Sequence, residues 1–146
     1  MAKVLKLGIT NNPGNRISDL NSIEAIAGKG IFGDRHFSEN KNSREQVTLI
    51  ESENIDKYNL NFNTKIPYLN FRRNIVTKGI KLNELINKKI FIGTSILIGK
   101  DLCRPCKHLQ ELLGYSNIVE EFLIKGGLRC EIINSGTIYI NDKIKI

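Results

Sequence analysis

The chain has 146 residues, the length of one ordinary domain, and we expect a single domain over residues 1–146 that buries its core without disulfides or a structural metal. Its hydrophobic fraction of 40% and charged fraction of 25% are globular values, and no apolar run approaches the ~20 residues that cross a bilayer. The formal net charge of +7 attracts anions, but the lysines are dispersed and the aromatic residues form no base-stacking stripe, which argues against nucleic acid as a partner.

The N-terminal segment alternates lysine with apolar side chains and contains no signal-peptide core. Three cysteines, an odd number, are consistent with free thiols in a reducing compartment. We therefore expect a cytoplasmic protein that does not enter a membrane.

Most of the chain shows the periodicity of short strands, separated by glycines or by Ser-Gly and Asn-Asp pairs. The predicted strands are 3–9, 46–50, 74–77, 89–92, 95–98, 128–133, 137–140 and 143–146. Strands this short and this frequent are typical of a barrel. We expect a mainly β (α+β) fold, with a closed or partly open β-barrel and a few short helices.

Three short helices are predicted between these strands. The first begins with Ser52 as its capping residue, and the second runs over 105–113 and ends at Gly114. The third runs over 117–125 and stops at a glycine pair. The second helix places Cys106 near its start.

The most informative motif is Cys103-Arg104-Pro105-Cys106, followed further along by Lys125-Gly126-Gly127-Leu128-Arg129. Thiolates bind soft metals, while arginine, lysine and exposed glycine amides bind phosphate. A ligand that carries both a metal and a phosphate would use the whole set. That description fits a molybdenum pterin better than it fits DNA or a protein partner.

A second group of polar residues lies in the long loops over 10–16 and 29–44, and loops longer than ~12 residues are often functional. Arginine, whose planar guanidinium suits bidentate capture of phosphate or carboxylate, recurs in this group, although strand capping and neutralisation of nearby acids would explain it equally well. The candidates in these loops are Asp34, Arg35 and His36 beside two turn glycines, and Arg44 before one predicted strand. Outside the loops, Arg72, Arg73 and Asn74 precede another predicted strand and are candidates as well.

The cysteine pair leaves other interpretations open. The two residues could be small side chains flanking a proline turn, or half of a zinc site whose remaining ligands would be His36 and His108, although these lack the usual spacing. A thioredoxin-like exchange site is disfavoured because the pair lies late in a strand-rich chain. Cys130, in an apolar strand, is expected in the core.

In their order along the chain, these motifs resemble the MOSC domain, which is named for the C-terminus of molybdenum cofactor sulfurase. The resemblance extends from residue 3 to residue 146 and rests on the segments 30–36, 46–50, 72–76, 103–106, 126–129 and 136–146. It implies a pyruvate-kinase-barrel-like fold, binding of the molybdenum cofactor (molybdopterin), and one cysteine that acts as a metal or sulfur ligand.

The resemblance also assigns residues. The family's ligand cysteine matches Cys106, which we predict to be the metal ligand and the catalytic residue; a helix start beside Arg104 and Lys107 would favour its thiolate. The predicted cofactor-binding residues are Arg35, His36, Arg73, Asn74, Lys125, Gly126, Gly127 and Arg129. Three of them, Arg35, Arg73 and Arg129, are expected to hold the pterin phosphate with help from Lys125. Asp34 is expected to orient its own loop or an arginine rather than to donate a proton.

Family members include cofactor sulfurases and enzymes that reduce N-hydroxylated substrates. No segment here matches the pyridoxal-phosphate, iron–sulfur or flavin modules of fuller members, so a redox partner or a cysteine desulfurase would supply electrons or sulfur, and pyridoxal phosphate would be on that partner only. The expected function is binding of the molybdenum cofactor, in support of either a molybdenum-dependent reduction of N-hydroxylated compounds or sulfur and cofactor transfer. The alternatives are a non-enzymatic cofactor carrier and a zinc- or thiol-binding module.

Overall fold

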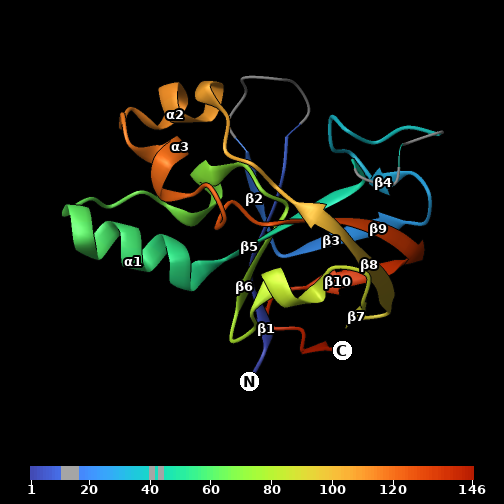
Figure 1. Ribbon diagram of the computed structural model, residues 1–146. Helices are drawn as coiled ribbons and strands as arrows, with labels where there is room; N and C mark the ends of the chain where they lie inside the picture. The colour runs from blue at the N-terminus through green and yellow to red at the C-terminus, as the bar shows by residue number, and fades with distance from the viewer. Residues whose placement is uncertain (11–16, 40–41, 43–44) are drawn as a thin grey trace.

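The computed structural model describes residues 1–10, 17–39, 42 and 45–146, which form a mainly β structure (Figure 1). The strands are β1 (Lys3–Ile9), β2 (Ser18–Leu20), β3 (Ser22–Ile26), β4 (Gly30–Ile31), β5 (Val47–Glu51), β6 (Ile75–Lys78), β7 (Lys89–Ile92), β8 (Ser95–Leu102), β9 (Leu128–Asn134), β10 (Gly136–Tyr139) and β11 (Ile144–Lys145). The helices are α1 (Ser52–Phe62), α2 (Lys107–Leu113) and α3 (Ile118–Glu121), with 3-10 turns η1 (Tyr68–Phe71) and η2 (Leu82–Leu85).

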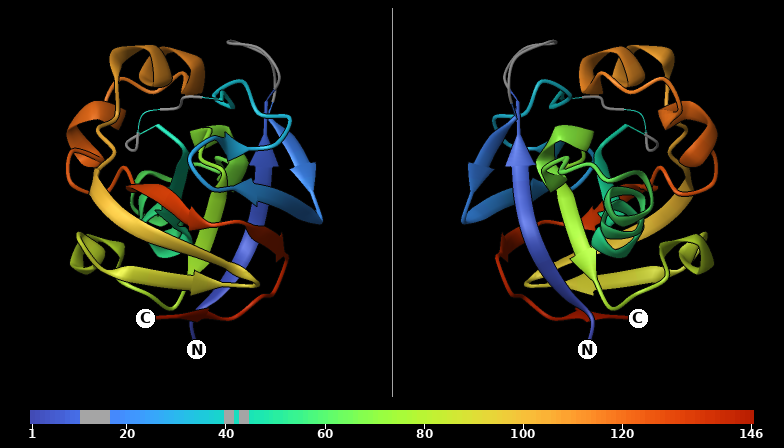
Figure 2. Two further views of the ribbon diagram at one scale, coloured as in Figure 1. Left: turned by 90° about the vertical axis from the view of Figure 1, so that its right-hand side faces the viewer. Right: turned by 90° about the vertical axis from the view of Figure 1, so that its left-hand side faces the viewer.

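Among the described residues the strands form two sheets. Eight strands follow the order β11-β7-β8-β9-β5-β6-β1-β2, and three follow β10-β3-β4. Figure 2 shows that the larger sheet curls around the molecule. Its two edge strands, β11 and β2, do not pair with each other in the described part of the chain. The mainly β fold predicted from the sequence is therefore confirmed in its partly open form.

The strand pairing requires one long connection. Strands β5 and β6 are parallel neighbours, with Leu49 opposite Ile75. A parallel pair cannot be joined by a tight turn, so the chain crosses over through α1 and η1 before it returns as β6. This crossover carries η1 and the following arginine pair to the end of the sheet where α2 and α3 lie (Figure 1).

Two apolar clusters hold these layers together. The larger lies between the sheets and includes fully buried Leu7, Leu49 and Leu128, together with Cys130, which confirms the core position predicted for that cysteine. The second packs α1, α2, α3 and η1 against the larger sheet, with the rings of Phe71 and Phe122 in tilted contact at 4.7 Å between centroids. No helix among the described residues is long and apolar enough to span a membrane.

Several predicted boundaries are wrong. Glu51, not Ser52, is the N-cap of α1, because β5 passes directly into the helix and Ser52 is already its buried first residue. The third helix ends at Glu121 because the chain then turns, with the Lys125 amide donating to the Phe122 carbonyl at 3.1 Å. Strands β2, β3 and β4 were missed. Strands β2 and β4 have only three and two residues, too few to show an alternation, whereas β3 does alternate, with Ile23 and Ala25 buried, and was overlooked.

The strand expected to stop before Gly99 runs on to Leu102. Any Cβ at Gly99 would overlap the backbone carbonyl of Leu85, so glycine permits η2 to pack against the middle of β8. The glycine therefore marks a close approach and a register shift between Gly99 and Asp101, not the end of the strand.

Candidate functional site

A cavity of about 220 Å³ lies where the loop before β5, the start of β6, the end of β8 and the start of α2 meet. Both cysteines of the C-x-x-C motif, Cys103 and Cys106, line it. So do five of the predicted cofactor-binding residues: Arg35, His36, Arg73, Asn74 and Arg129. Segments from four distant parts of the sequence thus contribute to one cavity.

The cavity gathers arginine and not lysine. The sequence contains seven arginines, of which Arg16 and Arg44 lie outside the described residues. The other five all line the cavity, and none of the fifteen lysines is among its described lining residues. The five are Arg35, Arg72, Arg73, Arg104 and Arg129. Planar guanidinium groups that converge in this way favour an anion with several oxygens, such as a phosphate.

The loop that carries Arg35 is anchored by the buried carboxylate of Asp34. Its Oδ1 accepts the amide of Thr10 at 3.0 Å, and its Oδ2 accepts the amide of His36 at 3.3 Å. The amide of Arg35 donates to the Thr10 carbonyl at 2.7 Å. Asp34 therefore holds the His36 amide of its own loop, as the sequence predicted, and also joins that loop to Thr10 at the end of β1.

Two adjacent arginines enter the cavity between η1 and β6. Arg72 caps η1 in the left-handed region, with φ of 64°. Burial, and then the nearby Arg35, lower the pKa of its guanidinium, whereas Asp34 opposes this shift. Arg73 donates from Nε to the Gly126 carbonyl at 2.9 Å, which directs the rest of its guanidinium toward the cavity.

The two cysteines of the motif occupy different environments. Cys103 is 3% exposed, and burial raises the pKa of its thiol, while Arg73, Arg129 and a hydrogen bond with Arg129 lower it. Cys106 is exposed and is the N-cap of α2, where its Sγ accepts the amide of Leu109 at 3.4 Å. Of the two thiols, Cys106 is thus the one that an incoming ligand can reach.

Asn74 lines the cavity but serves mainly as a connector of three strands. Its Oδ1 accepts the amide of Thr48 at 3.1 Å, and its Nδ2 donates to the carbonyl of Gly8 at 3.1 Å. The side chain therefore ties β5, the start of β6 and β1 together at the cavity that Arg73 also lines.

Three predicted cofactor-binding residues do not line the cavity. Lys125 lines a small hollow beside α1 instead. A Cβ at Gly126 would overlap the Cys103 carbonyl, and one at Gly127, where φ is 115°, would overlap the Leu49 carbonyl. The glycine pair thus allows the chain before β9 to pass close to Cys103 and Leu49, and its structural role is to seat Arg129.

Two of the cavity arginines, Arg72 and Arg104, were noted in the sequence as possible anion-binding residues but were not included among the predicted cofactor-binding residues. Both stand next to residues that were selected, and the scarcity of arginine in a lysine-rich chain was the signal that could have found them. Among the described residues, no three His, Cys, Asp or Glu side chains are grouped so that they could hold a metal ion.

Comparison with known proteins identifies the family. Residues 31–145 match the model of the MOSC domain, and the chain therefore belongs to the MOSC domain family. No curated protein matches the chain by sequence.

Solved structures share the fold. The YUAD protein from Bacillus subtilis superposes with a TM-score of 0.85 at 20% identity, over 99% of this chain and 94% of that chain. YiiM from Geobacillus stearothermophilus superposes at 0.77 with 10% identity, over 99% and 74% of the two chains. YiiM from Escherichia coli does so at 0.70 with 16% identity, over 98% and 68%.

Proposed function

We propose that the arginine-lined cavity binds the molybdenum cofactor, with Cys106 as the thiolate ligand of the metal. The observation that carries this proposal is the gathering of all five described arginines around one cavity that also holds the accessible thiol. The donor set fits the group, because guanidinium groups match a phosphate and a thiolate matches a soft metal.

Each part of the cavity has a separate task in this proposal. Arg35, Arg73 and Arg129 bind the phosphate of the pterin through charge-assisted hydrogen bonds. Asp34 keeps the loop of Arg35 and His36 in place through its two backbone contacts. The buried thiol of Cys103 forms a hydrogen bond with Arg129 and so helps to position it. The exposed Cys106 supplies the metal ligand.

The reaction that we propose is the reduction of an N-hydroxylated compound. The cofactor, when bound, supplies two-electron redox chemistry at its metal. The N–O bond breaks as two electrons and two protons enter, and the products are the amine and water. An external protein partner delivers the electrons. The same cavity would also serve transfer of sulfur or of the whole cofactor, with a cysteine desulfurase as partner.

Metal analysis tests the binding step. Protein from a host that makes the molybdenum cofactor should contain molybdenum, and protein from a cofactor-deficient host should not. Cys106→Ala should lose the metal, whereas Cys103→Ala, which removes a buried thiol, should retain more of it. Equal and negligible molybdenum from both hosts, or an unchanged content in Cys106→Ala, would refute the proposal.

A kinetic experiment separates the reductase from the carrier. Cofactor-loaded protein is mixed with a model hydroxylamine and a chemical electron donor, and amine formation is measured against protein from the deficient host. Amine formation that depends on the cofactor supports the reductase. Loaded protein that forms no amine but restores activity to a cofactor-free molybdenum enzyme supports the carrier.

A further inference from the structure

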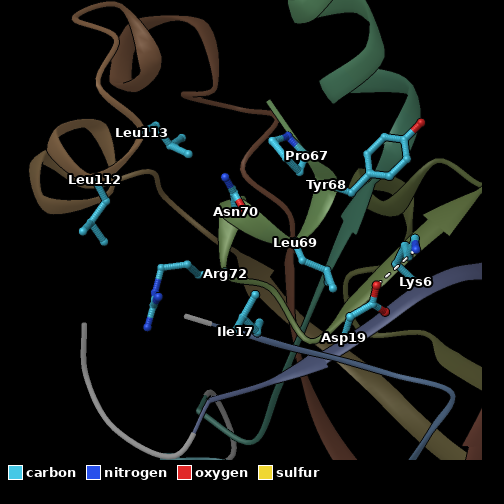
Figure 3. A pocket seen from close by; sticks show the side chains of 10 residues that line it. All are labelled: Lys6, Ile17, Asp19, Pro67, Tyr68, Leu69, Asn70, Arg72, Leu112 and Leu113. Carbon is cyan, nitrogen blue, oxygen red and sulfur yellow. Dashed lines mark hydrogen bonds and ion pairs between the residues drawn. The ribbon is translucent and has the colours of Figure 1, made fainter. Parts of the chain in front are cut away.

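Figure 3 shows a second and larger hollow of about 740 Å³. It lies next to the arginine-lined cavity, with which it shares lining residues. We call it the apolar groove. Its walls are formed mainly by η1 and α2, with Leu69, Leu112 and Leu113 among the lining side chains. Ligand sites of small molecules are typically ~300–1,000 Å³ and predominantly apolar, with a few polar groups that orient the ligand. The groove has the size and the lining of such a site.

The apolar groove and the arginine cavity share a wall. Ile17, Arg72 and Leu112 line both. The backbone of the shared Arg72 has a left-handed conformation, and its amide donates to the Leu69 carbonyl at 3.0 Å. This contact fixes the position of Arg72 at the end of η1. A ligand in the groove would therefore lie beside whatever occupies the cavity.

Charge distinguishes the two sides of the groove. Lys6 and Asp19 form an ion pair at 3.2 Å on one side, and Arg72 stands on the other (Figure 3). The hydroxyl of Tyr68 points away from the groove and donates to Asp56 at 2.6 Å. The positive charge of Arg72 is thus next to an apolar surface, where an anion is held more strongly than in water because the local dielectric is low.

We infer that the apolar groove binds a small amphipathic organic anion, with its apolar body over η1 and α2 and its anionic group at Arg72. An aromatic carboxylate has both features. Such a ligand would be a substrate for the chemistry of the neighbouring cavity, and this part of the inference rests on the proposed function. The binding of the anion to the groove does not depend on that function. The test is therefore carried out on cofactor-free protein.

The probes are 1-naphthoate and its uncharged counterpart 1-naphthamide, titrated by calorimetry. Wild-type protein should bind naphthoate saturably at one site. Asn70→Trp fills the groove from an exposed position that lines only this hollow, and it should weaken naphthoate binding about tenfold or more. Asn61→Trp, a matched exposed change on α1 outside the groove, should leave binding within about twofold.

A second variant tests the charge. Arg72→Gln should weaken naphthoate about tenfold, the loss expected for a charge-assisted contact, and naphthamide by much less. Absence of saturable naphthoate binding overturns the inference, as does equal weakening of both probes by Arg72→Gln or unchanged affinity in Asn70→Trp. Naphthoate binding in a protein that takes up no molybdenum would uphold the groove and refute the cofactor proposal.

Discussion

Five guanidinium groups around one cavity repel one another, and the described cavity lining includes only two carboxylates, those of Asp34 and Glu45, to offset them. The effect is visible at Arg72, where burial and the neighbouring Arg35 lower the pKa of the guanidinium. A bound phosphate would reverse this cost and gain bidentate hydrogen bonds as well. Removing one of these arginines should therefore weaken binding of an anion in the cavity much more than removing a surface lysine does.

We expect Arg73→Ala and Arg129→Ala each to weaken retention of the cofactor about tenfold or more, since a hydrogen bond to a charged group contributes roughly 1.5–3 kcal/mol. Retention is measured as molybdenum content after gel filtration. Lys125→Ala is the control, because that lysine lies beside α1 and not in the cavity. Equal losses in all three variants would show that net charge, and not the cavity, retains the ligand.

The carboxylate of Asp34 should be structural. Asp34→Asn keeps one oxygen but turns an amide group toward a backbone N–H, so one of its two backbone contacts is lost. We expect a destabilisation of about 1–3 kcal/mol in urea unfolding and a lower cofactor occupancy, with no shift in the pH profile of any reductase activity.

Asp19→Asn, which removes only an exposed ion pair with Lys6, is the matched control and should change stability by about 1 kcal/mol or less. A pH optimum displaced by about one unit in Asp34→Asn at full occupancy would make Asp34 a proton donor instead.

At the level of the elements, the cavity depends on how closely the two glycines before β9 approach neighbouring backbone. Gly126 lies against the Cys103 carbonyl and Gly127 against the Leu49 carbonyl. The chain enters this strand through Gly127, and the amide of Cys103 donates to the Gly127 carbonyl at 2.7 Å. Arg129 then follows opposite Thr48 in β5 and Asp101 in β8. Anything that displaces the start of β9 should displace Arg129 and Cys103 together.

Gly127→Ala tests this coupling. Its Cβ would overlap the Leu49 carbonyl, so β9 must move, and we expect a loss of several kcal/mol or a failure to fold. Gly114→Ala is the control: this glycine also has a positive φ, 79°, but nothing lies within 4 Å of its Cβ, so the cost should be about 1 kcal/mol. Thermal unfolding of the two variants should separate them clearly, and similar midpoints would contradict this account.

Glu51, at the junction of β5 and α1, should make stability depend on pH. Burial raises the pKa of its carboxyl above the ordinary 4.5, and the hydrogen bond from the Leu82 amide only partly opposes this. Between the unfolded and the folded pKa the native state binds more protons than the unfolded state, so this group makes stability fall as the pH rises through that window.

In Glu51→Gln this contribution should vanish, and the decrease in unfolding free energy from pH 4.5 to pH 7 should become smaller. Glu120→Gln, an exposed change on α3, should leave the decrease unaltered. An identical pH dependence in the wild type and Glu51→Gln would contradict the shifted pKa.

At the scale of the whole molecule, the positive charge is divided by residue type. Lysine supplies fifteen of the 22 positively charged side chains and is dispersed along the sequence, whereas the described arginines converge on one cavity. Salt should therefore screen the general attraction of the surface lysines for anions. The arginine-lined cavity should still bind some anions more tightly than others at the same ionic strength.

Inorganic phosphate should accordingly raise the thermal unfolding midpoint of the cofactor-free protein at constant ionic strength, and chloride should not. Binding to the native state alone stabilises by RT ln(1 + [L]/Kd), or about 2.7 kcal/mol when phosphate is at one hundred times its Kd. Arg73→Ala combined with Arg129→Ala should abolish the shift. The same increase in wild type and the double variant would assign it to the surface lysines.

The sequence by itself determined the strands that have a strong local signal. Residues 3–9 and 89–92 form strands within their predicted limits. In 89–92 the predicted alternation is kept, with Ile90 and Ile92 buried, whereas in 3–9 a register shift between Val4 and Lys6 interrupts it. The sequence also determined the family, through the order of motifs, and the core position of Cys130.

Only the tertiary structure decided which of the candidate residues meet. Arg35, Arg73 and Arg129 are far apart in sequence and converge because the loop before β5, the crossover into β6 and the start of β9 end at one side of the sheet. Lys125, only four positions before Arg129, lies elsewhere because the chain turns sharply through two glycines between them. Proximity along a chain does not determine the face on which a side chain lies, since that depends on strand register and on the backbones that pack against the turn.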